Sequence, residues 1–376
     1  MFSRTLTILL FIMPMAVFPQ STTRFAVVGD FGNDSLAEAE VATLIKSWNP
    51  DFVITTGDNN YEFGEATTID RNIGKYYHEF IYPYTGSYGP GDTANRFFPC
   101  LGNHDWVAAG AVPYLNYFTL PGNERYYDFV KGPVHFYSID SDPHEPDGQT
   151  SSSIQGQWLQ TNLAHGAEPW KIVYFHHPAF NSGARHGPTI AMRWPYKQWG
   201  ATTVMSGHEH VYERLIEDGL PYFTTGFGGK YIYPWATTID TGSQARYNAD
   251  HGAMLVVASF DSMRFTFANR SDSVIDSYTL HHTSTSGVSS GGGYLPLQFQ
   301  LFQNYPNPFN PVTKVSFVLG NSSFVVLKIS DVLGREVASL VNRQLDAGSY
   351  SFSWNAGNAA SGVFFYRLEL INSVTL

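Results

Sequence analysis

Short apolar runs separated by polar residues predict buried strands in the first part of the chain. Residues 24–30 (RFAVVGD) and residues 51–56 (DFVITT) are both rich in β-branched residues, and each run leads to a Gly-Asp pair. Between them, residues 35–48 carry apolar positions at helical spacing behind a Ser-x-x-Glu capping box. Strand, helix and strand in this order predict a βαβ unit with parallel strands, so Asp30 and Asp58 should emerge at the same edge of one sheet.

Two more buried strands are predicted further along the chain, and each runs into a loop that carries histidine. They cover residues 172–175 and 202–205. Ligands of open α/β sheets gather outside the carboxyl ends of the strands, and the four predicted strand ends carry Asp, Asp, His and His. Residues 254–280 differ, because turn residues separate their apolar runs and predict an antiparallel meander that closes the domain.

A run of Ser, Thr and Gly marks a domain boundary. Residues 283–294 have the composition of a flexible linker. We therefore expect a large α/β domain at residues 21–282 and a separate tail at residues 295–376. The pattern of the tail predicts a small all-β sandwich, which we expect to be immunoglobulin-like. Its apolar runs are residues 314–319, 324–330, 349–354 and 363–370.

The first twenty residues predict a secretory signal peptide. Arg4 precedes an apolar run over residues 6–18, and a polar stretch follows. The run is shorter than the roughly 20 residues that a membrane-spanning helix needs, and it contains Pro14. We therefore expect no stable transmembrane anchor. The alternative for residues 1–20 is a buried N-terminal strand.

The charge of the chain limits the partners that it can bind. The 376 residues include 22 Lys and Arg against 32 Asp and Glu, which gives a net charge of −10. Proteins that coat nucleic acid are normally basic, so we expect no nucleic-acid partner, and a bound metal ion would have to hold a polyanionic substrate. A single cysteine, Cys100, excludes an internal disulfide. All thirteen histidines lie between His78 and His282, so metal or acid–base chemistry belongs to the large domain.

Five short motifs of the large domain combine carboxylate, amide and imidazole groups. A Gly-Asp pair after a strand is by itself most often a turn, whereas a His-x-His pair in an extended segment points both rings to one face. Together, and at successive strand ends, the five motifs predict a centre of two metal ions. The motifs are Gly29-Asp30-Phe31-Gly32, Gly57-Asp58-Asn59-Asn60-Tyr61, Gly102-Asn103-His104-Asp105, Val173-Tyr174-Phe175-His176-His177 and Gly207-His208-Glu209-His210.

Two ions about 3.5 to 4 Å apart need a bridging carboxylate and a mixture of oxygen and imidazole ligands. We assign the bridge to Asp58. Tyr61, three residues further on, can add a phenolate beside a strongly acidic ion, which favours Fe³⁺ over Mg²⁺ or Ca²⁺. The alternative for Tyr61 is a packed aromatic residue. The remaining ligands are expected to be Asp30, Asn103, His176, His208 and His210.

The blocks GDFG, GDNNY, GNHD, VYFH and GHEH resemble the five ligand blocks of the calcineurin-like metallophosphoesterase superfamily, and the tyrosine in GDNNY is similar to that of the purple acid phosphatases. The resemblance covers about residues 24–282. It implies a four-layer α/β/β/α sandwich and a secreted acid phosphatase. It also implies that Asp30, Tyr61 and His210 hold Fe³⁺, that Asn103, His176 and His208 hold a divalent ion (Fe²⁺, Zn²⁺ or Mn²⁺), and that Asp58 lies between the two.

The expected reaction is hydrolysis of small phosphomonoesters by attack of a metal-bound hydroxide. The segment from Arg185 to Thr189 is similar to small mammalian-type acid phosphatases, in which its histidine, His186 here, faces the substrate. We expect His104 and His186 to bind the phosphate and to act as catalytic groups, with an acidic pH optimum if both must be protonated. We expect His177 to line the substrate pocket. The alternative for His186 is a surface loop residue.

The tail has a resemblance of its own, over about residues 297–376. Its segments QNYPNPFNP, DVLGR and ASGVFFYRL look like the C-terminal sorting domain that the type IX secretion system of Bacteroidetes-type bacteria reads. The resemblance implies export through the periplasm of a Gram-negative bacterium, to the cell surface or the medium. The alternative is an ordinary carbohydrate- or partner-binding β-sandwich.

Other functions stay open on the sequence alone. Within the same fold, a phosphodiesterase or nucleotidase is the nearest rival to an acid phosphatase. A surface binding protein that keeps the metal centre but does not turn over is a second alternative. The loops at residues 63–96 and 142–153, which would shape the substrate pocket, follow no pattern that predicts their structure.

Overall fold

The computed structural model describes residues 22–166, 168–282 and 300–371, apart from residues 303, 305, 306, 320, 321, 347, 358, 360 and 361. The predicted signal peptide (residues 1–20) and the predicted linker (residues 283–294) lie outside the described residues. Among the described helices, none combines the length and the apolar character that crossing a membrane requires.

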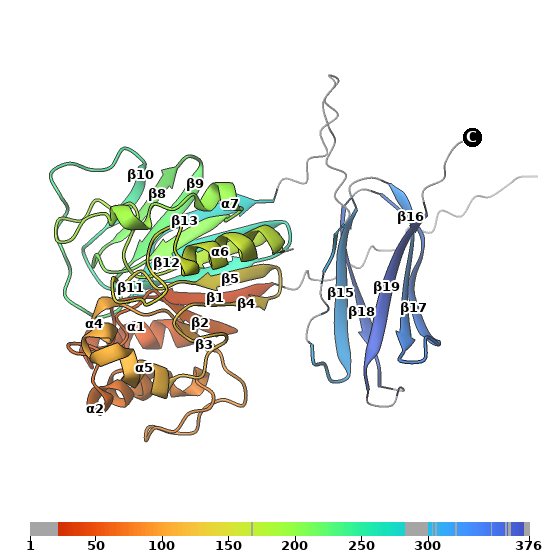
Figure 1. Cartoon of the computed structure of the whole chain (residues 1–376), viewed down its shortest axis with the longest axis horizontal. Helices are drawn as coiled ribbons and strands as arrows, with labels where there is room; N and C mark the ends of the chain where they lie inside the picture. Colours follow the sequence, from red (N-terminus) through yellow and green to blue (C-terminus); the bar gives the residue numbers. More distant parts are fainter. Residues whose placement is uncertain are drawn as a thin grey trace, which may run out of the picture.

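Two β-sheets form the centre of the large domain (Figure 1). The first has six strands in the order β13 (Val274–His281), β12 (Ser262–Asn269), β11 (Gly252–Ala258), β1 (Thr23–Val28), β2 (Phe52–Thr55) and β3 (Phe97–Pro99). The second has seven in the order β10 (Ser243–Tyr247), β8 (Tyr212–Glu217), β9 (Leu220–Thr225), β7 (Thr203–Ser206), β6 (Trp170–Tyr174), β5 (Val134–Ser138) and β4 (Tyr127–Lys131). The main helices are α1 (Leu36–Ser47), α2 (Ala66–Ile69), α3 (Lys75–Tyr77), α4 (Asn103–Val107), α5 (Val112–Tyr117), α6 (Ile154–His165) and α7 (Tyr196–Trp199).

The predicted βαβ unit is confirmed. β1 and β2 pair in parallel, with Phe25 opposite Phe52, and α1 connects them. The hydroxyl of Ser35 caps α1 by accepting a hydrogen bond from the Glu38 amide at 3.1 Å. The carboxylate of Glu38 turns back to accept the amide of Asp34 at 2.7 Å, so the cap also fixes the loop that follows β1.

The two sheets pack face to face through aromatic side chains. Phe136 of the second sheet meets the rings of Phe25 and Phe52 of the first edge to face, with centroids 4.9 and 5.3 Å apart. Helix α1 packs on the outer face of the first sheet, whereas α6 and α7 pack on the outer face of the second through a separate apolar cluster. These layers form the predicted four-layer α/β/β/α sandwich.

The meander predicted at residues 254–280 is also confirmed, because β11, β12 and β13 pair antiparallel in succession. At the far edge, Arg214 of β8 donates from its Nε to Asp276 of β13 at 2.7 Å, so an ion pair joins the two sheets.

The segment at residues 63–96, for which the sequence predicted no structure, contains a helical stretch. This stretch runs from α2 through a π-helical turn (Asp70–Gly74) and α3 to a 3₁₀ turn (His78–Phe80).

The tail is a β-sandwich, as predicted. One sheet contains β14 (Gln300–Leu301), β15 (Val312–Leu319) and β18 (Gly348–Asn355), and the other contains β17 (Glu336–Leu345), β16 (Ser323–Asp331) and β19 (Phe364–Ile371). Val315, Phe317, Val325 and Leu327 form the centre of its core. The sequence did not predict β17, because this edge strand is mostly exposed and carries little apolar pattern.

Candidate metal centre

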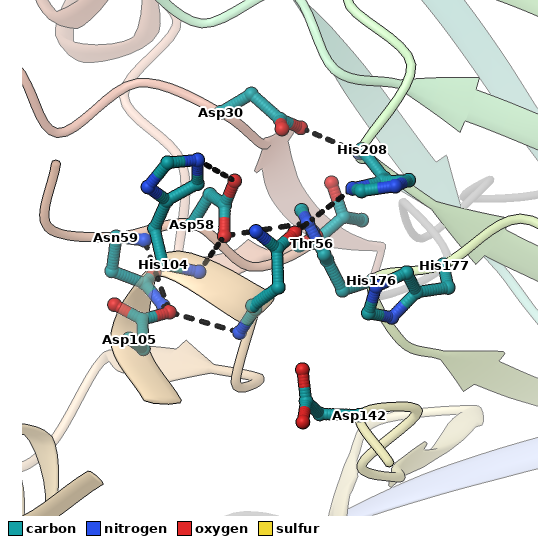
Figure 2. A network of polar contacts seen from close by, with 12 residues as sticks. Asp30, Thr56, Asp58, Asn59, His104, Asp105, Asp142, His176, His177 and His208 are labelled. Carbon is teal, nitrogen blue, oxygen red and sulfur yellow. Dashed lines mark hydrogen bonds and ion pairs between the residues drawn. The ribbon is translucent and has the colours of Figure 1, made fainter. Parts of the chain in front are cut away.

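Loops at the ends of strands from both sheets bring the seven predicted ligand residues together. They are Asp30 after β1, Asp58 and Tyr61 after β2, Asn103 after β3, His176 after β6, and His208 and His210 after β7. Figure 2 labels four of them, namely Asp30, Asp58, His176 and His208. The residues that follow the first sheet all carry oxygen donors, and those that follow the second sheet all carry imidazole nitrogens. The sheet packing brings together residues as far apart in the sequence as Asp30 and His208.

Tight backbone turns aim these side chains inward. Asp30, Asp58 and His208 have φ angles of 54°, 53° and 68°, in the left-handed region that side chains other than glycine rarely adopt. Such conformations cost about 1 to 3 kcal/mol each and concentrate at functional sites. The neighbouring loop needs glycine for another reason, because a Cβ at Gly102 would lie 2.3 Å from Oδ1 of Asp58.

On one side of the centre, Tyr61, Asp30 and His210 face one another. The Tyr61 hydroxyl lies 3.1 Å from Oδ1 of Asp30 and 3.2 Å from Nε2 of His210. Nδ1 of His210 lies 2.6 Å from the Tyr231 carbonyl oxygen and must donate its proton there. In the neutral ring Nε2 then carries the lone pair, which faces the other two donors, as in metal-binding histidines.

The other side is built in the same way around His176. Its Nδ1 donates to the Thr56 carbonyl at 2.8 Å. Its Nε2 lies 3.1 Å from Oδ1 of Asn103, 3.3 Å from Oδ1 of Asp58 and 3.1 Å from Nδ1 of His208. Figure 2 shows His176, His208 and Asp58 converging on this point.

The donor set fits a metal centre. Donor atoms of Asp30, Asp58 and His176 lie within 4.8 Å of one another, and all three residues are buried. Carboxylate, amide and imidazole lone pairs that face one another need a shared cation. In the metal-free protein a proton takes that place: burial lowers the pKa of His176, but the charges of Asp58 and Asp30 outweigh it and raise the pKa to about 10. Metal binding would therefore release this proton.

The ionisation of Tyr61 also depends on a nearby cation. Burial and the charges of Asp30 and Asp58 raise its pKa well above the usual value, so the metal-free protein holds Tyr61 as a neutral phenol. The alternative of a packed aromatic residue accounts for its burial. It does not account for a hydroxyl placed between a carboxylate and an imidazole lone pair.

Of the three other predicted site histidines, His104 lies beside Tyr61, with ring centroids 4.4 Å apart, whereas His177 and His186 lie beside His208. Nδ1 of His104 donates to the Glu62 carbonyl at 2.6 Å, and its Nε2 lies 4.0 Å from Oδ2 of Asp58. The ring of His177 lies 4.4 Å from that of His208. The exposed ring of His186 lies 4.2 Å from His208 as well, so His186 belongs to the site rather than to a remote surface loop.

Their surroundings lower the pKa of two of these histidines in the metal-free protein. Burial and the charge of His176 lower the pKa of His177 to about 3. Burial and the charges of His210 and Arg185 lower the pKa of His186. Ser141 accepts the backbone amide of His177 at 2.9 Å, and its hydroxyl can donate to Nδ1 of the same residue, also at 2.9 Å. Nε2 of His177 then carries the proton and can donate a hydrogen bond.

Asp105 lies behind the proposed ligands and holds their loops. Its Oδ2 accepts hydrogen bonds from the amide of Gly102 at 2.9 Å and from the side chain of Asn59 at 2.9 Å. Burial and the charge of Asp58 raise its pKa to about 7. Asp105 therefore ties the loop of Asp58 to the loop of Asn103.

The sequence analysis did not single out two residues of the site. Glu209, between the two histidines of the GHEH motif, is buried and accepts the backbone amides of His186 and Gly187, which fixes the loop that carries His186. Lys230 lies over the ring of Tyr61. Glu209 could have been found from the sequence, because it is a charged residue inside a motif predicted to be buried. Nothing in the sequence around Lys230 marks it as a site residue, apart from the glycines that precede it.

Comparison with known proteins identifies a family for each of the two parts of the chain. Residues 23–212 match the calcineurin-like phosphoesterase family, and residues 303–375 match the secretion system C-terminal sorting domain. The chain is 25% identical over 238 residues to purple acid phosphatase 17 of Arabidopsis thaliana, covering 55% of this chain and 68% of the relative. It is 26% identical over 250 residues to tartrate-resistant acid phosphatase type 5 of Rattus norvegicus, covering 56% and 73%.

The fold is also similar to a solved structure, that of the purple acid phosphatase PPD1 from seeds of yellow lupin (Lupinus luteus). The TM-score is 0.58 at 17% sequence identity, and the similarity covers 70% of this chain and 54% of that one. The first family match spans just over half of the chain. The protein therefore belongs to the calcineurin-like phosphoesterase family, whose members hydrolyse phosphoric esters.

Proposed function

We propose that the protein is a secreted acid phosphatase that hydrolyses small phosphomonoesters at a binuclear metal centre. The observation that carries the proposal is the convergence of carboxylate, amide and imidazole lone pairs in a buried site, with two histidines whose tautomers are set by backbone carbonyls. The printed names of the relatives, purple acid phosphatase and tartrate-resistant acid phosphatase, favour a monoester substrate and an acidic optimum.

The proposed ligand sets follow the contacts within the site. Tyr61, Asp30 and His210 contact one another and would hold Fe³⁺, because a phenolate ligand needs a strongly acidic ion. Asp58 would bridge the two ions. The divalent ion (Fe²⁺, Zn²⁺ or Mn²⁺) would be held by Asn103, His176 and His208.

Such a pair of ions polarises the phosphoryl group and lowers the pKa of a water molecule so that it can act as nucleophile. The chain then has to hold the ester in line and stabilise the charge that develops. His104 is fixed by Glu62 and directs its Nε2 toward Asp58, where it can contact a phosphate oxygen. His177 would donate a hydrogen bond from Nε2 on the side of His208.

His186 is the proposed proton donor to the leaving group. Its ring is exposed and lies beside His208, so it can reach a leaving oxygen that points to solvent. Replacing His186 by Ala should slow alkyl phosphates more than aryl phosphates, because an alkoxide needs protonation more than a phenolate does. Equal slowing of both substrates would exclude the role of acid.

The proposal includes the division of the chain and its export. We propose that residues 1–20 are removed as a signal peptide, that residues 21–282 are the catalytic domain, that residues 283–294 are a linker and that residues 295–376 direct type IX secretion. The match of residues 303–375 to a sorting-domain family supports this role for the tail. Deleting residues 295–376 should leave active enzyme in the periplasm, and normal export of the shortened chain would contradict the role.

Phosphate release from one generic monoester and one diester across a pH series tests the activity. The protein is the chain from residue 21, loaded with iron and zinc. Faster monoester turnover at acidic pH is the expected result. Preference for the diester at neutral or alkaline pH would point to a phosphodiesterase, and no turnover with both ions bound would point to a binding protein.

A further inference from the structure

Lys230 is held next to the metal centre by its own backbone. It follows β9 through a loop of glycines that packs on the loop after β1, where a Cβ at Gly228 would lie 2.5 Å from Cβ of Phe31. The amide of Lys230 donates to the carbonyl of Asp30 at 3.0 Å, and its carbonyl accepts Nε2 of His251 at 2.8 Å. The position of Lys230 is therefore fixed to that of the ligand Asp30.

The side chain of Lys230 is almost fully buried and lies over a ligand ring. Nζ lies 4.4 Å from the centroid of the Tyr61 ring and 5.6 Å from that of Tyr231. Its ionic partner is Glu62, the residue after Tyr61, whose carboxylate is about half exposed. An ammonium group has three donors and no lone pair, so a charged Lys230 cannot bind a metal ion and must act through the groups that it contacts.

We propose that Lys230 is a positioning residue that tunes Tyr61, holding a positive charge against the face of its ring. This inference rests on the proposed function, in which Tyr61 binds Fe³⁺ as a phenolate. A cation over an aromatic face is attracted to the ring electrons, and it is attracted more strongly to a phenolate, whose negative charge extends over the ring. Lys230 thereby favours the phenolate and makes its electrons harder to remove.

The consequence is an electronic change at the iron. Moving an electron from the Tyr61 ring to Fe³⁺ takes it away from the nearby ammonium and therefore needs more energy when Lys230 is charged. Lys230 should shift the phenolate-to-iron absorption band to shorter wavelength. A role in binding substrate phosphate instead would raise KM when Lys230 is lost and would leave the band in place.

The test is the visible spectrum of the iron-loaded chain from residue 21, with iron content measured on the same samples. In Lys230→Gln we expect the band to move to longer wavelength by about 10 nm or more, the scale set by a unit charge at this distance. Lys230→Arg keeps the positive charge and should leave the band at its wild-type wavelength. Lys131→Gln is the matched control, because Lys131 is a partly buried lysine over another ring, 5.6 Å from the centroid of Phe98, and it should leave the band unchanged.

A second variant guards against loss of folding in Lys230→Gln. Glu62→Gln removes the counter-charge and keeps the ammonium, so its band should move in the opposite direction, to shorter wavelength. If the band stays in place in both variants while iron is retained, the role of Lys230 is overturned. The proposed function is then unaffected. Absence of a visible band in the iron-loaded wild-type chain overturns the Fe³⁺–Tyr61 assignment and the inference with it.

Discussion

The two sheets of the large domain bring different chemistry to the metal centre. The loops after the first sheet carry the oxygen donors, namely Asp30, Asp58, Tyr61 and Asn103, and the loops after the second carry only imidazoles, namely His176, His208 and His210. In the proposed ligand sets, each ion needs donors from both sheets. The centre can therefore form only when the sheets are packed together, and metal binding should stabilise that packing.

The two sheets are also coupled through a histidine tautomer. Nδ1 of His176, from the second sheet, donates to the carbonyl of Thr56, which follows β2 of the first sheet. His210 instead donates to Tyr231, within the part of the chain that follows the second sheet. The orientation of His176 therefore depends directly on the sheet interface, whereas that of His210 does not.

Loss of the proposed bridge should have the largest effect. In Asp58→Ala the first sheet no longer offers a shared carboxylate, and we expect the rate of monoester hydrolysis to fall at least about a thousand-fold, because metal ions contribute several kcal/mol to such reactions. Phosphate release and metal content per chain measure the result. Asp142→Asn is the control, because Asp142 lies near the site but accepts hydrogen bonds from His144. If Asp58→Ala kept two metal ions per chain and the wild-type rate, Asp58 could not be the bridging ligand.

Removing one imidazole at a time should separate the two ions. His208 and His210 follow the same strand, but the ring of His210 contacts Tyr61 and Asp30, whereas the ring of His208 contacts His176. We expect His210→Ala to lose iron and His208→Ala to lose the divalent ion, each with a rate reduced on the order of a hundred-fold. Elemental analysis of both proteins decides, and loss of the same metal from both would contradict the assignment.

Chelation should weaken the packing of the sheets. An ion present at a hundred times its Kd adds about 2.7 kcal/mol to stability, and in a domain of this size that corresponds to a fall of about 5 to 10 °C in Tm when the ion is removed. Calorimetry of the wild-type chain with and without a chelator measures the change. The Tm of His210→Ala should fall less on chelation, because this variant has already lost one ion. A wild-type Tm that does not change with the chelator would show that metal binding does not stabilise the packing of the sheets.

The ion pair at the far edge should contribute least. Burial raises the pKa of Asp276, but hydrogen bonds from Arg214 and Tyr212 outweigh it and lower the pKa below its unfolded value. The stability that the pair adds is thus present above the unfolded pKa of about 3.9 and is lost as the pH falls through the folded value. We expect Asp276→Asn to cost about 1 kcal/mol at pH 7, because the variant loses a charge-assisted hydrogen bond in a pair that keeps some contact with solvent, with exposed fractions of 13% for Arg214 and 12% for Asp276.

Urea unfolding of Asp276→Asn at neutral and at acidic pH measures this dependence. The difference from the wild-type chain should shrink at the lower pH. Asp331→Asn is the matched control, because Asp331 pairs with Arg335 on the exposed surface of the tail, and it should leave the large domain unchanged. A cost that does not change with pH would mean that packing, not charge, sets the contribution of Asp276.

The sequence predicted the centre better than its surroundings. β1, α1 and β2 have strong local patterns, and the two aspartate motifs and two histidine motifs follow buried strands, so the pattern predicted that these motifs share one edge. The motifs themselves and the family resemblance identified the individual ligands. The helical run between Ala66 and Phe80 has no clear period, because it changes from α to π to 3₁₀ geometry along its length. Lys230 and Glu209 act on groups that are distant in the chain, so no local pattern marks them.

The sequence by itself determined which donor types the protein has and the turn after each strand from which they project, because these depend on neighbouring residues. Only the tertiary structure decided which donors face one another, which nitrogens of His176 and His210 face backbone carbonyls, and where the side chain of Lys230 lies. Asp30 and His208 lie 178 positions apart and still meet at 2.9 Å, backbone amide to carboxylate. The packing of the two sheets sets such a distance, and neither loop sets it alone.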